Sequence, residues 1–335
     1  MSDTKWLVIT SKAASFGIGL SVCSNFLLLL LIQILPINVF GSYKYLMIAF
    51  SLFSLFYTMV ETFLQPLIHI YDDTCFIIQR KSFDYSHVAA RAISSTYCGC
   101  LASSFTLFAV HFIYRYWAIC KPKKLVLFSG SYAFAWVLGV FLTAFSWAAF
   151  AFFCFPENDR TLESFKYVVD EFYDLKATET DYVAYTFWWY PNGVREIDLI
   201  SIIGVAQHFV VMSVSFFIVF YCGTLTMVQM RKAPTLSPKT QKMQNQLFKA
   251  LVFQTAIPTL FIYIPTLIVF LAPVFNLAIG AYGNMAIVTI HLYPGIDPLI
   301  FLFVISDFRK AIGKSPKKAI EMTSQVFNRS PSIVG

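Results

Sequence analysis

Long apolar stretches separated by short polar segments dominate the sequence, and their lengths carry the first prediction. Seven of these stretches are long enough to cross the roughly 30 Å hydrocarbon core of a bilayer as α-helices. Formal charge occurs inside them only at Glu61 and Asp297. The pattern therefore predicts an all-α membrane protein folded as a seven-transmembrane helix bundle. The predicted spans cover about residues 13–35, 45–70, 92–114, 125–155, 199–230, 250–275 and 282–305.

The composition supports a membrane environment. Of the 335 residues, 58% are hydrophobic and 13% are charged, whereas a soluble domain carries about 25% charged residues. A single protein core could not bury this much apolar surface, so lipid must act as the solvent. The first span follows neither a strongly basic segment nor a small-residue cleavage site. We therefore interpret it as an uncleaved helix and not as a signal peptide.

Charge is distributed unevenly between two sets of connecting segments. One set holds 16 Lys and Arg residues and two acidic residues, whereas the other holds nine basic and 14 acidic residues. The positive-inside rule places the first set in the cytosol and the N-terminus outside. The positive-inside rule thus explains the net charge of +7, because the excess of basic residues lies in the cytosolic segments. The charge is therefore no indication of a nucleic-acid partner, and none is predicted. The cytosolic set is 36–44, 114–124, 231–249 and 306–335; the outer set is 1–12, 71–91, 156–198 and the short last turn.

The long outer loop 156–198 contains a helical pattern. Leu162, Phe165, Val169 and Phe172 recur at helical spacing, with acidic residues between them. We expect an amphipathic helix that lies across the outer mouth of the bundle as a lid. The alternative is a solvated acidic loop that makes no contact with a ligand.

A second short helix is predicted directly after the seventh span. Phe308, Ala311 and Ile312 alternate with Arg309 and Lys310, a pattern typical of a cytosolic amphipathic helix at the membrane interface. The basic residues of the cytosolic set suit anionic membrane lipid and the surface of a partner protein.

Several segments, in order along the chain, resemble the Str class of nematode serpentine chemoreceptors. The resemblance implies a G-protein-coupled receptor for a small, volatile odorant in the ciliary plasma membrane of chemosensory neurons. It also implies a heterotrimeric G protein as partner and, by family analogy, a trafficking chaperone. The segments are Gly41-Ser-Tyr-Lys-Tyr-Leu-Met47, His111-Phe-Ile-Tyr-Arg-Tyr116, Phe220-Tyr-Cys-Gly223, Gln246-Leu-Phe-Lys-Ala-Leu251, Gln254-Thr-Ala-Ile-Pro-Thr259 and Tyr293-Pro-Gly-Ile-Asp-Pro-Leu-Ile300.

A looser resemblance to rhodopsin-like receptors suggests residues for the conformational switch and for G-protein coupling. Arg115 ends the third span where those receptors carry the arginine of Asp-Arg-Tyr, but Tyr114 replaces the acid. Asp297 and Pro298 resemble the start of their Asn-Pro-x-x-Tyr element. A carboxylate inside a span needs a polar partner, and we expect Asn25 to be the partner of Asp297; a purely structural network is the alternative. The predicted switch and coupling residues are Arg115, His111, Asn25, Pro265, Asp297, Pro298 and Phe301.

The ligand-binding residues are predicted from depth within the spans. At roughly 1.5 Å per residue, Tyr97 lies about 27 Å outward of Arg115, near the outer mouth. A few polar groups at this level would give a small-molecule site within apolar walls. Any one of them could instead serve helix packing. The candidates are Tyr97, Cys98, Leu101, Gln207, His208, Tyr263, Thr266, Asn284, His291 and Glu61.

The remaining chemistry of the chain is sparse. Cys75 and Cys154 both fall at outer ends of spans and could form a disulfide; two free thiols are the alternative. The seven cysteines do not have metal-ligand spacing, so neither a metal nor a cofactor is predicted. No pair of intramembrane aspartates and no lysine in the seventh span is present, which argues against an enzyme and a retinal pump. A chemosensory ligand-gated ion channel remains the alternative function, although the sequence shows no filter loop.

Overall fold

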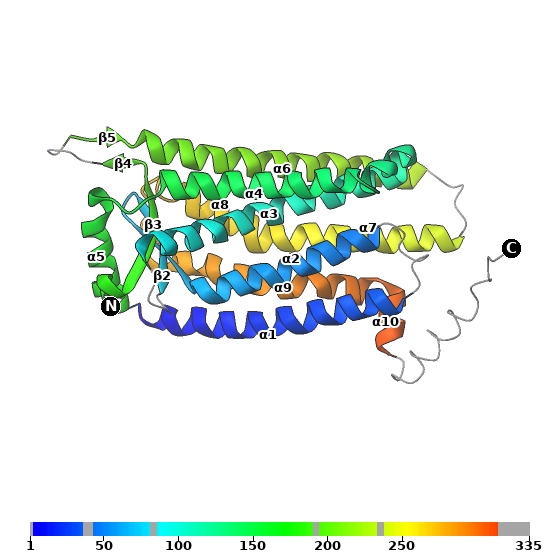
Figure 1. The fold of residues 1–335 in the computed structure, drawn as a ribbon, viewed down its shortest axis with the longest axis horizontal. Coiled ribbons are helices and arrows are strands. Elements are labelled where there is room, and N and C mark those ends of the chain that lie inside the picture. The colour runs from blue at the N-terminus through cyan, green and yellow to red at the C-terminus, as the bar shows by residue number, and fades with distance from the viewer. Residues whose placement is uncertain (1–2, 36–42, 81–85, 190–193, 233–237, 314–335) are drawn as a thin grey trace.

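Seven long apolar helices run side by side along the longest axis of the molecule in the computed structural model (Figure 1). The structure describes residues 3–35, 43–80, 86–189, 194–232 and 238–313. Each helix is long and apolar enough to cross a membrane, which confirms the predicted number of spans. They are α1 (Lys5–Ile34), α2 (Tyr43–Leu64), α3 (His87–Cys120), α4 (Tyr132–Cys154), α6 (Leu199–Lys232), the composite sixth span of α7 (Pro238–Pro258), η5 (Thr259–Tyr263) and α8 (Ile264–Leu271), and α9 (Asn284–Val304).

Several boundaries differ from the predictions. The second helix ends at Leu64, not at residue 70, because a strand begins at Pro66. The fourth helix begins at Tyr132, after the 3-10 helix η2 (Pro122–Phe128). The first helix begins at Lys5, so most of the predicted N-terminal segment 1–12 is helical.

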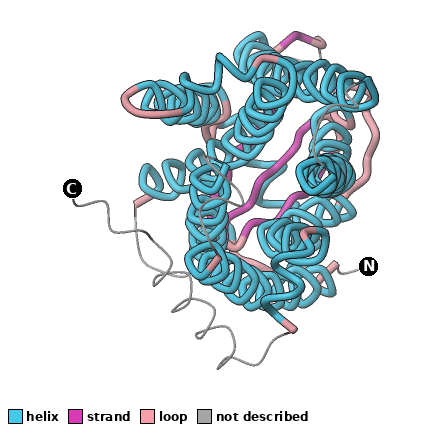
Figure 2. Tube along the Cα trace, turned by 90° about the vertical axis from the view of Figure 1, so that its right-hand side faces the viewer, coloured by secondary structure: helices cyan, strands magenta, loops and turns pink. Residues whose placement is uncertain are grey.

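A three-stranded antiparallel sheet, which the sequence patterns did not predict, covers one end of the bundle. Its strands β1 (Pro66–Tyr71), β2 (Thr74–Arg80) and β3 (Thr180–Thr186) are joined in that order. Figure 2, which looks along the bundle, shows the strands crossing between the helix ends. A second, two-stranded sheet pairs β4 (Trp188–Trp189) with β5 (Glu196–Ile197).

The sheet is apolar on both faces because alternate residues of a strand point to opposite sides. On one face Phe76 and Tyr182 pack against the helix α5 (Asp159–Tyr173). On the other face Val183 and Tyr185 belong to the main core of the bundle. We call β1, β2, β3 and α5 together the cap. The predicted amphipathic helix is thus confirmed as α5. It packs on the sheet, and its last residue, Tyr173, contacts Asn284 of α9. Its role as a lid stays a prediction.

The far end of the bundle carries the second predicted short helix. This helix, α10 (Ser306–Ile312), follows α9 and buries Phe308 completely, while Arg309 and Lys310 are exposed. Residues 314–335 of the predicted tail lie outside the described residues. Two further 3-10 helices among the described residues are η3 (Ala177–Glu179) and η6 (Ala281–Gly283).

The sixth span is irregular where its prolines cluster. A proline removes one backbone donor and clashes with the carbonyl of the preceding turn. Between Pro258 and Pro265 the backbone forms the π-helical turn η5. Such turns are frequent at functional sites.

Candidate ligand-binding and coupling sites

A cavity of about 50 Å³ lies between the cap and the helices. Ile68 and Ile77 of the sheet roof it, and apolar side chains of five helical segments form most of its wall. A single water requires about 10–15 Å³ of such volume, so the space suits a molecule of only a few heavy atoms. The lining residues are Ile68, Ile77, Tyr97, Cys98, Leu101, Trp147, Phe155, Tyr185, His208, Thr266, Val269, Phe270, Ala286 and Ile290.

Three polar side chains of this lining have a buried polar atom without a hydrogen-bond partner. His208 Nδ1 lies 2.7 Å from the Gly204 carbonyl oxygen. A carbonyl only accepts, so Nδ1 carries the proton and Nε2 is an acceptor. His208 Nε2 and the hydroxyls of Thr266 and Tyr97 are buried and have no hydrogen-bond partner among the described residues. By contrast, the Tyr185 hydroxyl already donates to the Val269 carbonyl oxygen at 3.0 Å.

Five of the ten predicted ligand residues line this cavity, and five do not. Gln207 donates to the Ser146 hydroxyl at 2.9 Å and therefore faces α4. Tyr263 packs against Phe105, with the ring centroids 4.3 Å apart and the ring planes tilted by 49°. Of the predicted set, the lining contains Tyr97, Cys98, Leu101, His208 and Thr266; it omits Gln207, Tyr263, Asn284, His291 and Glu61.

Glu61 and His291 pair with each other outside the cavity. Glu61 Oε2 lies 3.5 Å from His291 Nδ1, and both side chains are almost completely buried. The pair joins α2 to α9. The pair therefore links two helices in the structure, and a role of these residues as ligand contacts stays a prediction.

The roof residues were the main omission of the sequence analysis. Ile68 was assigned to a membrane span, and Ile77 and Tyr185 to outer loops. Their alternation within short strands was the available signal. It was obscured because both faces of this sheet are buried, so the strands lack the usual polar side.

Asn284 anchors the cap to the bundle. Its side chain accepts from the Ile68 backbone N–H at 2.9 Å and donates to the Tyr173 hydroxyl at 2.9 Å. The same hydroxyl lies 3.1 Å from His69 Nδ1. Since Tyr173 accepts from Asn284, its own proton is available for His69 Nδ1, which requires a neutral imidazole. One hydrogen-bonded chain thus connects α9, α5 and β1.

Acid should loosen this anchor. Burial lowers the pKa of His69 from 6.5 to about 4. The folded state therefore holds fewer protons than the unfolded state between these two values. The neutral His69 contributes about 3 kcal/mol to the free energy of unfolding. This contribution is complete above pH 6.5 and is lost as the pH falls towards 4. We expect the melting temperature of the purified protein to fall over this range. In His69→Gln, which cannot titrate, the fall should be smaller; identical pH profiles of the two proteins would contradict the assignment.

At the opposite end of the bundle, Arg115 stacks on an aromatic ring in place of pairing with an acid. Its guanidinium carbon lies 3.8 Å from the ring centroid of Tyr43. Tyr43 also contacts His111, with its hydroxyl 3.5 Å from Nδ1, and packs edge-on against Phe301. We call Tyr43, His111, Tyr114, Arg115 and Phe301 the Arg115 cluster. Tyr43 was missed as a switch residue, although it lies in the Gly41–Met47 motif.

The partner expected for Asp297 is wrong. Gln254 of α7 donates its amide to both carboxylate oxygens, at 3.3 and 3.2 Å. Asn25 instead donates to the Pro294 carbonyl oxygen at 2.9 Å. Pro298 explains this contact, because it has no N–H for the carbonyl four residues earlier in α9. The side chain of α1 therefore replaces the missing backbone hydrogen bond.

Cys75 and Cys154 are both free thiols in the structure, so the possible disulfide is not formed. Cys75 lies buried in β2, and burial raises the pKa of its thiol to about 12. A thiol in this state is a poor nucleophile.

The seven long apolar helices define a multi-pass membrane protein. Residues 10–313 match the family described as serpentine type 7TM GPCR chemoreceptor Str. The chain belongs to this family. It is 41% identical to serpentine receptor class r-10 of Caenorhabditis elegans over 313 residues, covering 93% of this chain and 92% of that protein. It is 40% identical to the receptor of the same name from Caenorhabditis briggsae, over 94% and 92% of the two chains. G-protein coupled receptor str-33 of Caenorhabditis elegans is 30% identical, over 91% and 90%.

Proposed function

We propose that this chemoreceptor is an odorant receptor that binds a small neutral volatile in the cavity beneath the cap and activates a heterotrimeric G protein. The observation that carries the proposal is the cavity itself. Its apolar wall and the three unpartnered polar groups of its lining suit a compact molecule with one or two polar atoms.

The cavity also bounds the affinity. A ligand of about six heavy atoms gains at most about 9 kcal/mol, at about 1.5 kcal/mol per atom. This corresponds to sub-micromolar binding at best. Such a receptor would respond to micromolar concentrations of its ligand. It would discriminate between candidate ligands mainly by their size.

The proposed orientation places the cap outside the cell and the Arg115 cluster, which is buried, at the cytosolic end of the bundle. Support comes from the excess of Lys and Arg in the connections of the Arg115 end. The proposed location is the plasma membrane of sensory cilia. A heterotrimeric G protein, membrane lipid and a trafficking chaperone are the proposed partners, by family analogy.

Filling the cavity should abolish the response. Ala286 lines the cavity and is 5% exposed. Ala286→Leu adds three carbon atoms to a space that holds only a few, so we expect the concentration for half-maximal response to rise at least a hundredfold. The assay is G-protein activation in cells expressing the full chain, challenged with volatiles of graded size.

The neighbouring residue provides a matched control. Met285 is 59% exposed on the outside of the bundle, and Met285→Leu should leave the response unchanged. Surface expression of both variants is measured in parallel. Normal responses in a well-expressed Ala286→Leu receptor would contradict the location of the site. Odorant-evoked current in cells without G proteins would support the ion channel instead.

A further inference from the structure

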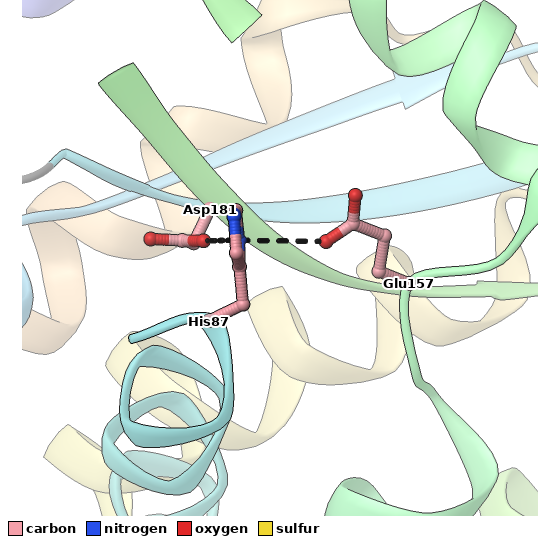
Figure 3. Close-up of side chains that lie close together, drawn as sticks. All are labelled: His87, Glu157 and Asp181. Atoms are coloured by element: carbon pink, nitrogen blue, oxygen red, sulfur yellow. Dashed lines mark hydrogen bonds and ion pairs between the residues drawn. The ribbon is translucent and has the colours of Figure 1, made fainter. Parts of the chain in front are cut away.

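Three metal-ligating side chains meet at the rim where the cap joins the bundle. His87, Glu157 and Asp181 place one potential ligand atom each within 4.8 Å of the others. The Nδ1 atom of His87 lies 2.5 Å from an Asp181 oxygen and 3.9 Å from a Glu157 oxygen. Figure 3 shows the imidazole standing between the two carboxylates.

Each ligand is held by a different element of the fold. His87 is the first residue of α3, whose N-terminus is capped by the Ser86 side chain. Asp181 lies on β3, opposite Gln79 of β2. Glu157 follows α4 in the connection to α5. The three backbone positions are therefore fixed by a helix start, a strand and a short connection.

An ion from solvent can reach the three side chains, of which one is buried in the protein. The side chain of Asp181 is 5% exposed, whereas those of Glu157 and His87 are 40% and 69% exposed. The other four histidines of the chain are at least 96% buried, as their exposed fractions of 1–4% show. His87 is thus the one histidine that a dissolved metal ion can reach.

The donor set favours a transition metal over other ions. Two carboxylates and one imidazole are ligands that Zn²⁺ accepts, at about 2.0–2.2 Å. Tetrahedral ligands at this distance lie about 3.4 Å apart, a value that falls between the two distances measured from Nδ1. Shifts of about 1 Å would bring all three atoms onto one ion. Ca²⁺ would need six to eight oxygen ligands instead.

Among the described residues that line the hollow, an arginine opposes the binding of a cation. Arg91, one turn after His87 in α3, lines the same hollow. Its guanidinium carbon lies 4.2 Å from the ring centroid of Phe152, which it covers. The arginine reduces the negative potential of the two carboxylates and should therefore limit the affinity.

We propose that His87, Glu157 and Asp181 form a binding site for a divalent transition-metal ion of the zinc type, with water completing the coordination. The bound ion joins the start of α3 and the end of α4 to the cap. It therefore stabilises the closed roof over the cavity. Spacing along the sequence did not reveal the site because its ligands are 70 and 24 residues apart and meet only after β3 joins the sheet.

The test uses the full-length protein purified in detergent and ZnCl₂ alone. We expect one Zn²⁺ per chain in a competition titration against a chromophoric chelator, with excess Ca²⁺ and Mg²⁺ present. Zinc should also raise the melting temperature. His87→Ala and Glu157→Gln should each weaken binding at least tenfold and abolish the shift in melting temperature, whereas Arg91→Gln should tighten binding.

Asp159→Asn serves as the matched control, because Asp159 is an exposed acid two residues from Glu157 but outside the cluster. Its zinc affinity should equal that of the parent protein. Both ligand substitutions change exposed side chains, so the variants should fold, as melting without zinc will show. Absence of zinc binding, or equal affinity in His87→Ala and the parent protein, would overturn the proposal.

Discussion

Arg115→Ala should reach the cell surface in normal amounts and yet fail to activate the G protein. The side chain is 3% exposed and stacks on Tyr43. Its Nε and Nη2 atoms have no hydrogen-bond partner among the described residues. These donors could bind carbonyl groups of a partner helix, and hydrogen bonds from a charged group contribute about 1.5–3 kcal/mol. Their loss corresponds to a roughly ten- to hundredfold loss of coupling.

Two further variants separate coupling from packing. Arg115→Lys keeps the charge but loses the planar group that stacks on Tyr43, so it should restore only part of the signal. Lys124 is an exposed cation near Trp117, 5.7 Å from its ring centroid, and Lys124→Ala should signal normally. Ligand binding and surface expression are measured together with G-protein activation. Full signalling by Arg115→Ala would remove this residue from the coupling mechanism.

Gly17→Ala should strongly destabilise the bundle. A Cβ atom at this position would lie 2.3 Å from the His291 carbonyl oxygen. Gly295 on the facing helix is also in close contact, since its Cβ would lie 2.8 Å from the Ser21 backbone nitrogen. The obstacle in both cases is backbone, which cannot rotate away. Overpacking costs about 1–3 kcal/mol, and we expect the upper end of this range at Gly17.

Gly19 offers a control on the same helix. A Cβ atom there meets nothing within 4 Å. Gly19→Ala should be neutral or raise stability by up to about 1 kcal/mol, because alanine favours the helix. Melting temperatures of the purified variants make the comparison. If the Gly17→Ala and Gly19→Ala variants have the same melting temperature, the close contact of α1 and α9 does not contribute to stability.

The close contact has a functional consequence as well. It lets Asn25 reach the Pro294 carbonyl and Ser24 reach the Gly295 carbonyl, both at 2.9 Å. His291, whose carbonyl faces Gly17, also pairs with Glu61 of α2. A displaced α9 would therefore disturb the link to α2. We expect Gly17→Ala to alter ligand response in addition to stability.

The sequence by itself determined the features that depend on local pattern. The lengths of the apolar runs predicted seven spans, because a helix must satisfy its backbone hydrogen bonds within lipid. The helical periods at Leu162–Phe172 and Phe308–Ile312 predicted α5 and α10, because side chains three and four residues apart share one face. Ordered motifs predicted the family.

Only the tertiary structure decided which distant residues meet. Strand pairing of residues 66–80 with residues 180–186 builds the roof of the cavity, and no local period encodes that pairing. In the structure Gln254, and not Asn25, is the hydrogen-bond partner of Asp297. The aromatic ring that contacts the Arg115 guanidinium is that of Tyr43. The physical reason is that burial and periodicity act within one segment. Which partner a buried polar group finds depends instead on how neighbouring helices are rotated and how closely they approach. In this protein, close contacts such as that of Gly17 with His291 fix the approach of α1 and α9.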